Sequence, residues 1–234
     1  VDRNDIRVEY QPIVNLVTGE VHAAGALVRW RHSGRGNVPP SRFISIAEDT
    51  GLIVPIGRMV LREACQRAVA WRSNSRGTHA FRMSVNLSGR HFQEGSLVDD
   101  VQEALRESGL EAWALTLEIT ESVLMQRSET TLEKLRALKA TGLSLAIDDF
   151  GTGYSSLGYL QQFPIDVLKI DRTFVDVVGD PTQDPVLARG TIARGKTLEL
   201  ETIAEGIERP EQRDALRTLG CTLGQGFLFA RPMP

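Results

Sequence analysis

Oxygen-bearing side chains recur at the ends of apolar, strand-like segments of this sequence. Asn86 lies at the end of one segment, Glu118 at the end of the next, and the pair Asp148-Asp149 after a third. Carboxylate and amide oxygens are the ligands that hard divalent cations prefer, and no soft ligand accompanies them to favour zinc or copper. These four residues therefore predict a site for Mg²⁺ or Mn²⁺.

Such a site suits the hydrolysis of a phosphodiester. Two neighbouring carboxylates can serve two cations about 3.5–4 Å apart, one activating a water and one stabilising the leaving oxygen. Lys169 and Arg29, at the ends of two other segments, would then face the phosphate. The remaining polar residues at segment ends are Glu121, Asp171, Glu205, Glu208 and Gln225.

Each of these residues also has an ordinary structural role. A single acid after a strand is more often a helix N-cap or a solvated charge, which applies to Glu121, Asp171 and Glu208. Asn86 could likewise be an N-cap, and Asp148-Asp149 could open a turn. Neither role accounts for polar residues at nearly every strand end, so the functional prediction depends on the whole set.

The elements that must position these residues alternate between strand and helix. Segments 8–14 and 21–30 flank a turn and predict an antiparallel hairpin. Further strands are predicted at 81–87, 115–119, 143–147, 167–170 and 201–204, and helices near 99–108, 129–140, 184–199 and 210–219. This alternation favours a closed α/β barrel, whose strand ends meet at one rim. The rival, an open doubly wound sheet, lacks a GxGxxG motif after its first strand.

Length and composition agree with one globular domain spanning residues 1–234. The chain is 41% apolar and 24% charged, and its net charge of -3 disfavours binding to duplex nucleic acid. Two cysteines, far apart, predict neither a disulfide framework nor a zinc site. No apolar run is long enough to insert into a bilayer. We expect a cytoplasmic domain, and the abrupt start at Val1 suggests a piece of a larger multidomain signalling protein.

A series of short motifs runs through nearly the whole chain. They lie at 10–13 (YQPI), 26–32 (ALVRWRH), 40–48 (PSRFISIAE), 85–88 (VNLS), 117–122 (LEITES), 148–157 (DDFGTGYSSL), 167–171 (VLKID), 204–208 (AEGIE), 225–227 (QGF) and 231–232 (RP). In this order they resemble the EAL-domain family, bacterial proteins that hydrolyse or sense cyclic di-GMP. The resemblance implies a modified TIM-like (β/α)8 barrel whose first strand runs antiparallel to the others.

The resemblance also implies a role for each site residue. The implied cation ligands are Asn86, Glu118, Asp148 and Asp149, and the implied catalytic residues, which position, deprotonate or hold the attacking water, are Lys169, Glu205 and Gln225. The implied nucleotide contacts are Gln11, Leu27, Arg29, Asp171 and Glu208. Glu121 would anchor the loop from Asp149 to Leu157, which completes the cation site and joins a dimer contact. A homodimer and an upstream sensor or cyclase-like domain are expected on the same grounds.

One residue departs from the family pattern. The family takes its name from Glu-Ala-Leu, and this chain has Gly25 before Ala26 and Leu27. The glutamate is a cation ligand in active members, so its loss should weaken metal binding. A glycine within a strand can also mark a bulge or a close approach, but the ligand is absent in either case. Losing one carboxylate also lowers repulsion of the nucleotide, by about 3 kcal/mol for like charges about 5 Å apart at an effective dielectric near 20.

Three functions follow from this departure. The first is a degenerate EAL domain that binds cyclic di-GMP with little or no hydrolysis. The alternative is an active Mg²⁺- or Mn²⁺-dependent phosphodiesterase that produces pGpG, since Glu118, Asp148, Asp149 and Glu205 all remain. The third is an interaction module that binds no nucleotide.

Overall fold

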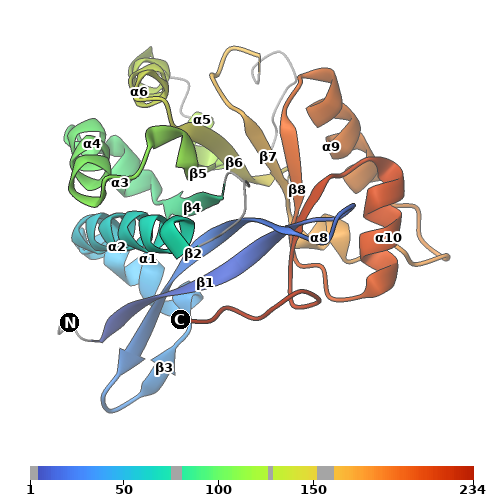
Figure 1. The fold of residues 1–234 in the computed structure, drawn as a ribbon, viewed down its shortest axis with the longest axis horizontal. Coiled ribbons are helices and arrows are strands. Elements are labelled where there is room, and N and C mark those ends of the chain that lie inside the picture. Colours follow the sequence, from blue (N-terminus) through green and yellow to red (C-terminus); the bar gives the residue numbers. More distant parts are fainter. Residues whose placement is uncertain (1–4, 75–80, 126–128, 152–160) are drawn as a thin grey trace.

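The computed structural model describes residues 5–74, 81–125, 129–151 and 161–234. Within these residues eight strands close into a ring in the order β1-β9-β8-β7-β6-β5-β4-β2, and β3 pairs with β2 outside it (Figure 1). The strands are β1 Ile6–Asn15, β2 Val21–His32, β3 Gly36–Val38, β4 Arg82–Leu87, β5 Leu115–Thr120, β6 Ser144–Phe150, β7 Val167–Ile170, β8 Glu201–Ala204 and β9 Leu223–Gln225. The predicted TIM-like barrel is confirmed, and the open sheet is excluded.

Helices lie around the outside of the barrel (Figure 1). They are α1 Pro40–Thr50, α2 Ile53–Asn74, α3 Gly89–Gln93, α4 Leu97–Ser108, α5 Glu121–Leu124, α6 Glu129–Ala140, α8 Arg172–Val175, α9 Val186–Thr197 and α10 Pro210–Leu219, with a 3-10 helix η1 at Ala112–Ala114. None of the helices in these described ranges is long and apolar enough to cross a membrane. Close packing of α9 on β8 requires Gly195, where an added Cβ would lie 2.4 Å from Thr202 Cγ2.

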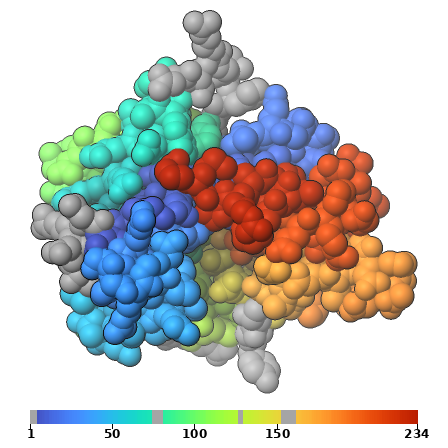
Figure 2. All heavy atoms as spheres, turned by 90° about the horizontal axis from the view of Figure 1, so that it is seen from below, coloured from blue at the N-terminus to red at the C-terminus, as the bar shows by residue number. Residues whose placement is uncertain are grey.

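The first strand runs antiparallel to both of its neighbours, as predicted. It pairs with β2 through the opening hairpin and with β9 at the other edge, and the remaining ring pairs are parallel. The C-terminal segment returns to this strand, where Tyr10 and Met233 exchange two backbone hydrogen bonds of 2.6 and 2.9 Å. In Figure 2 this segment, in red, lies against the blue N-terminal strands. The C-terminal segment therefore braces the place where the ring closes.

The predicted elements appear close to their expected positions, and three of the differences bear on the site. Strand β6 continues three residues beyond its predicted end, so the aspartate pair lies inside the strand rather than after it. Helix α1, which begins at Pro40 directly after Pro39, was not predicted, and no side chain caps its first turn. Strand β9 has only three residues, too few for a period-two pattern to identify it.

Apolar residues fill one end of the barrel interior. A single cluster takes one residue from each of six strands: Ile13, Ala23, Ala146, Val167, Ile203 and Leu223. Two larger clusters lie outside the ring, one beneath α2, α4 and α6 and the other beneath α9 and α10. The barrel is therefore packed at its amino-terminal end, and polar groups are left for the carboxyl end.

Candidate active site

The site forms a second layer inside the barrel, two residues closer to the carboxyl rim than the apolar layer on each strand; on the antiparallel β1 this means two residues earlier in the chain. Side chains in a strand alternate between faces, so residues two apart point into the same interior. On β6, for example, Ala146 belongs to the apolar layer and Asp148 to the site. The other pairs, apolar residue first, are Ile13 and Gln11, Ala23 and Gly25, Val167 and Lys169, Ile203 and Glu205, and Leu223 and Gln225. Strand periodicity thus gathers the predicted residues at one rim.

Lys169 lies at the centre of this layer, where its ammonium contacts three carboxylates. Its Nζ is 2.6 Å from Glu205 Oε1, 2.7 Å from Glu118 Oε2 and 3.0 Å from Asp148 Oδ1. Burial disfavours the charged lysine, but the three carboxylates outweigh it and raise the pKa of Lys169 well above its usual value. Ser84 donates a 2.5 Å hydrogen bond to the other oxygen of Glu118. Both carboxylate oxygens of Glu118 therefore have hydrogen-bond partners within the protein.

A break in the β6–β7 pairing brings two consecutive aspartates to one site. The register shifts between Ile147 and Phe150, and Asp149 adopts a left-handed backbone with a φ of 54°. In a regular strand the two side chains would point to opposite faces. A local irregularity of this kind re-aims a side chain, and here Asp149 Oδ lies beside Asp148 instead of outside the barrel.

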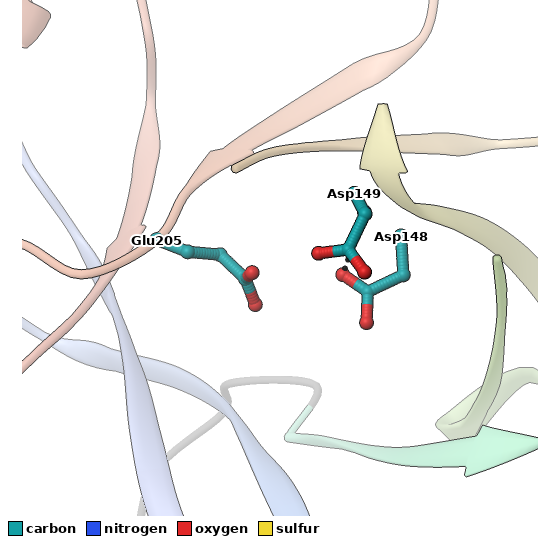
Figure 3. Close-up of side chains that lie close together, drawn as sticks. All are labelled: Asp148, Asp149 and Glu205. Atoms are coloured by element: carbon teal, nitrogen blue, oxygen red, sulfur yellow. Dashed lines mark hydrogen bonds between the residues drawn. The ribbon is translucent and has the colours of Figure 1, made fainter. Parts of the chain in front are cut away.

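Asp148, Asp149 and Glu205 form a carboxylate cluster. One oxygen from each lies within 4.8 Å of the others, and the two aspartates face Glu205 across the site (Figure 3). Partial burial and repulsion from Asp148 and Asp171 raise the pKa of Asp149 to about 6. Burial likewise raises the pKa of Glu205 to about 7, against the opposing effect of Lys169. The cluster carries more negative charge than its neighbours neutralise.

Gly25 lies in the wall of the same pocket. It pairs with Gln11 on β1 and with Ser84 on β4, and an added Cβ would lie 3.2 Å from Gln225 Nε2. That amide donates to Gln11 Oε1 at 3.0 Å, and Gln11 in turn donates to Ala230 O at 3.0 Å. A side chain at position 25 would therefore point into the pocket, against the amide of Gln225.

Two adjoining hollows make up the site. The first has a volume of about 270 Å³ and holds most of the polar layer. The second, of about 540 Å³, runs beneath α1 and α2 and has a more apolar lining, including Ile44 and Ile56. Leu27, Asn86 and Asp148 line both. Asn86 is exposed there, and the following helix α3 is capped by Ser88 instead. The N-cap alternative for Asn86 is therefore wrong.

The other predicted residues lie around this centre. Arg29 lines the second hollow and not the first, and its Nε donates to Glu9 Oε2 at 3.0 Å. Asp171 caps α8 by accepting from Thr173 N at 2.9 Å, as the N-cap alternative predicts, and also interacts with Asp149. Glu121 accepts a 3.0 Å hydrogen bond from Gly151 N, at the start of the loop it was predicted to anchor. Residues 152–157 of that loop lie outside the described residues.

The sequence reasoning assigned no role to two residues that line the rim. Arg172 lines the first hollow and pairs with Glu208 at 3.0 Å, and its stem crosses the backbone at Gly206, where a Cβ would lie within 3.0 Å of it. Phe227 also lines this hollow, with Arg231 stacked 4.4 Å from its ring centre. Arg172 directly follows the quoted residue Asp171, and Phe227 ends the quoted motif 225–227, so motif position could have indicated both.

Comparison with known proteins agrees with this geometry. The family model described as "EAL domain" matches residues 1–232. The chain belongs to the EAL-domain family. Over 231 residues this EAL domain is 43% identical to the cyclic di-GMP phosphodiesterase NbdA of Pseudomonas aeruginosa, covering 99% of the chain and 29% of NbdA.

A second relative is known in sequence and in structure. The bifunctional diguanylate cyclase/cyclic di-GMP phosphodiesterase MucR of P. aeruginosa is 43% identical over 235 residues, which cover 100% of this EAL domain and 34% of MucR. A solved structure of MucR phosphodiesterase in complex with c-di-GMP superposes with a TM-score of 0.93 and 43% identity, covering 100% of this chain and 94% of that one. The chain spans about a third of the length of these curated relatives.

The donor set of this EAL domain fits a hard divalent cation. Asp148, Asp149 and Glu205 offer only oxygen, within the span of one ion, and Asn86 adds an exposed amide beside them. Burial and like-charge repulsion together raise the pKa of Asp149, and a bound cation would offset both effects. Glu118, a predicted ligand, is held by Lys169 and Ser84 in this arrangement, and its part in cation binding stays a prediction.

Proposed function

We propose that this EAL domain binds cyclic di-GMP at the carboxyl rim of the barrel and hydrolyses it slowly or not at all. The observation that carries the proposal is Gly25. Its side-chain position opens into the pocket, between Gln225 and the carboxylate layer, at the place where the family supplies a glutamate ligand. Glycine offers no oxygen there, so a bound cation has one anionic ligand fewer.

The shape and chemistry of the rim support binding of a dinucleotide. The two hollows share Leu27, Asn86 and Asp148, so one ligand can occupy both. Cyclic di-GMP has two phosphates: the polar hollow suits the phosphodiester that is cleaved, and the larger, more apolar hollow suits a planar base together with the second phosphate, near Arg29. MucR phosphodiesterase, a structural neighbour over the whole chain, was solved with c-di-GMP bound.

Mg²⁺ or Mn²⁺ would be held by Asp148, Asp149 and Glu205, with Asn86 beside them. When bound, such a cation neutralises phosphate charge and lowers the pKa of a coordinated water. Without a carboxylate at position 25, we expect this site to bind its metal weakly. Weak metal binding is compatible with retention of the nucleotide, because one repelling charge has also gone.

The chain's own residues divide the remaining tasks. The ammonium of Lys169 stays protonated at neutral pH, so it can orient a water or a phosphate oxygen but cannot accept a proton. Glu205 belongs to the same carboxylate cluster, so it would position the attacking water beside the cation by accepting a hydrogen bond from it. Gln225, fixed by Gln11, presents its amide to the same pocket.

The decisive experiment restores the missing ligand. We expect Gly25→Glu to raise Mg²⁺-dependent hydrolysis of cyclic di-GMP by orders of magnitude over the wild-type domain. Gly25→Ala is the matched control, because it adds the same Cβ against Gln225 without an oxygen. Rapid hydrolysis by the wild-type domain, or an equal gain from both substitutions, would overturn the proposed loss of activity.

The second candidate is an active phosphodiesterase that produces pGpG. It is favoured by the completeness of the remaining layer, because Lys169 contacts the carboxylates of Glu118, Asp148 and Glu205. The wild-type rate in the same assay separates the two candidates. The third candidate is an interaction module that binds no nucleotide. Calorimetry with cyclic di-GMP, with and without EDTA, tests it, because such a module would give no binding heat.

For the whole protein we infer a cytoplasmic EAL domain joined to a sensor or cyclase-like domain, because its curated relatives extend well beyond the matched region. A homodimer is the expected assembly. Light scattering of the domain with and without cyclic di-GMP would test it.

A further inference from the structure

Glu9 is a partly buried acid on β1 that the site as described above does not use. It lies two residues before Gln11 and stands opposite Leu27 of β2. Since side chains two apart in a strand share a face, Glu9 belongs to the face that lines the rim. Its side chain is only 15% exposed, so it is not a solvated surface charge.

The partner of Glu9 is Arg29, the residue expected to contact phosphate. Arg29 Nε donates to Glu9 Oε2 at 3.0 Å, and Arg29 Nη1 donates to the carbonyl of Val28 at 3.0 Å. The other oxygen of Glu9 is 3.1 Å from Nη2 of Arg7. The Glu9 carboxylate is thus held on one side while it holds the guanidinium of Arg29 on the other.

We propose that Glu9 is a positioning residue that fixes the Arg29 guanidinium for a phosphate group in the larger hollow. A guanidinium has five N–H donors, and the protein uses two of those of Arg29. The other three are left for a ligand, and Arg29 lines the hollow together with Asn86 and Asp148. This inference rests on the proposed function, because it assigns the phosphate of cyclic di-GMP as the ligand.

Glu9 has two opposing effects on a bound dianion. Its charge repels the phosphate, whereas its hydrogen bond removes the conformational freedom that a long arginine side chain would otherwise lose on binding. If Glu9 is a positioning residue, its hydrogen bond to Arg29 should affect nucleotide affinity more than its charge does. Substitutions that remove the charge alone, or the charge together with the hydrogen bond, can separate these two effects.

The test compares Glu9→Gln with Glu9→Ala. Glutamine keeps an oxygen acceptor for Arg29 Nε and removes the charge, and alanine removes both. We expect Glu9→Gln to bind cyclic di-GMP at least as tightly as the wild-type domain, and Glu9→Ala to bind about 3- to 10-fold more weakly, the range for one newly ordered long side chain. Calorimetry in EDTA measures both without hydrolysis. The matched control is Glu133→Gln, which removes the same charge from an exposed position on α6.

A second readout needs no nucleotide. The hydrogen bond to Glu9 slows exchange of the Arg29 Nε–H with water. Its ¹H–¹⁵N signal should therefore be visible in the wild-type, Glu9→Gln and Glu133→Gln domains, and weaker or lost in Glu9→Ala. Folding of each variant is checked by its melting temperature.

The outcomes separate this inference from the proposed function. If the wild-type domain gives no heat with cyclic di-GMP, both are overturned. If the wild type binds and Glu9→Ala binds equally well, Glu9 does not contribute to binding. If Glu9→Ala binds more tightly, Glu9 acts as a repelling charge. Either result overturns this inference alone. The same holds if the Arg29 signal persists at full intensity in Glu9→Ala.

Discussion

At the scale of single residues, the site is organised by one cation. Lys169 is 3% exposed and contacts three carboxylates that the strands bring to the same layer. Without it, Glu118, which is also 3% exposed, would keep only the hydroxyl of Ser84 as a partner. A buried charge left without its counterion is far more costly than the pair itself is stabilising.

We therefore expect Lys169→Met to lower the free energy of unfolding by about 3–5 kcal/mol. Urea denaturation measures the change. Lys196→Met is the matched control, because it makes the same change at an exposed position on α9, where substitutions usually alter stability by about 0.5 kcal/mol or less. Equal losses in the two variants would contradict a central role for Lys169.

At the scale of elements, the short strand β9 is positioned by glycines. At Gly226, which follows β9 directly, an added Cβ would lie 2.1 Å from the carbonyl oxygen of Ile207 and 2.3 Å from its nitrogen. Both atoms belong to the backbone, so no side-chain rotation can relieve the contact. Gln225, the last residue of β9, reaches the pocket because this backbone approach is possible.

Gly226→Ala should therefore destabilise the domain by more than about 2 kcal/mol, in the upper part of the range for single substitutions. Gly190→Ala in α9 is the opposite case, because nothing lies within 4 Å of its added Cβ. There the same change should stabilise by about 0.5–1 kcal/mol, since alanine is the better helix former. Melting temperatures of the two variants should move in opposite directions.

At the scale of the whole molecule, the closed barrel holds acids together that would separate in an unfolded chain. The cluster of Asp148, Asp149 and Glu205 exists only when β6 and β8 occupy their places in the ring. A cation that binds this cluster binds the folded state alone, so it must stabilise the fold.

With a Kd of about 1 mM, 10 mM Mg²⁺ would stabilise the wild-type domain by about 1.4 kcal/mol, or about 3–6 °C in melting temperature. Gly25→Glu should give a larger shift, because the added carboxylate strengthens binding. NaCl at the same ionic strength is the control for general screening of charges. A shift that is the same for NaCl and MgCl₂ would argue against a specific cation site.

The sequence by itself determined the barrel and most of its polar rim. Strand periods placed Asn86, Glu118 and Lys169 correctly, because a period-two pattern fixes which face a side chain occupies once the strand is known. Motif order added the antiparallel first strand and the family, and the absence of a carboxylate at Gly25 needs no structure to be seen.

Only the tertiary structure decided which of these residues form ion pairs and hydrogen bonds with one another. Contacts between different strands determine three of these arrangements. Lys169 pairs with Glu118, Asp149 lies beside Asp148, and Glu9 accepts a hydrogen bond from Arg29. Arg172 and Phe227 reach the pocket for the same reason. Such contacts follow from strand register, a local break in pairing and close backbone approach, which are set by packing across the whole ring and leave no periodic signal in the chain.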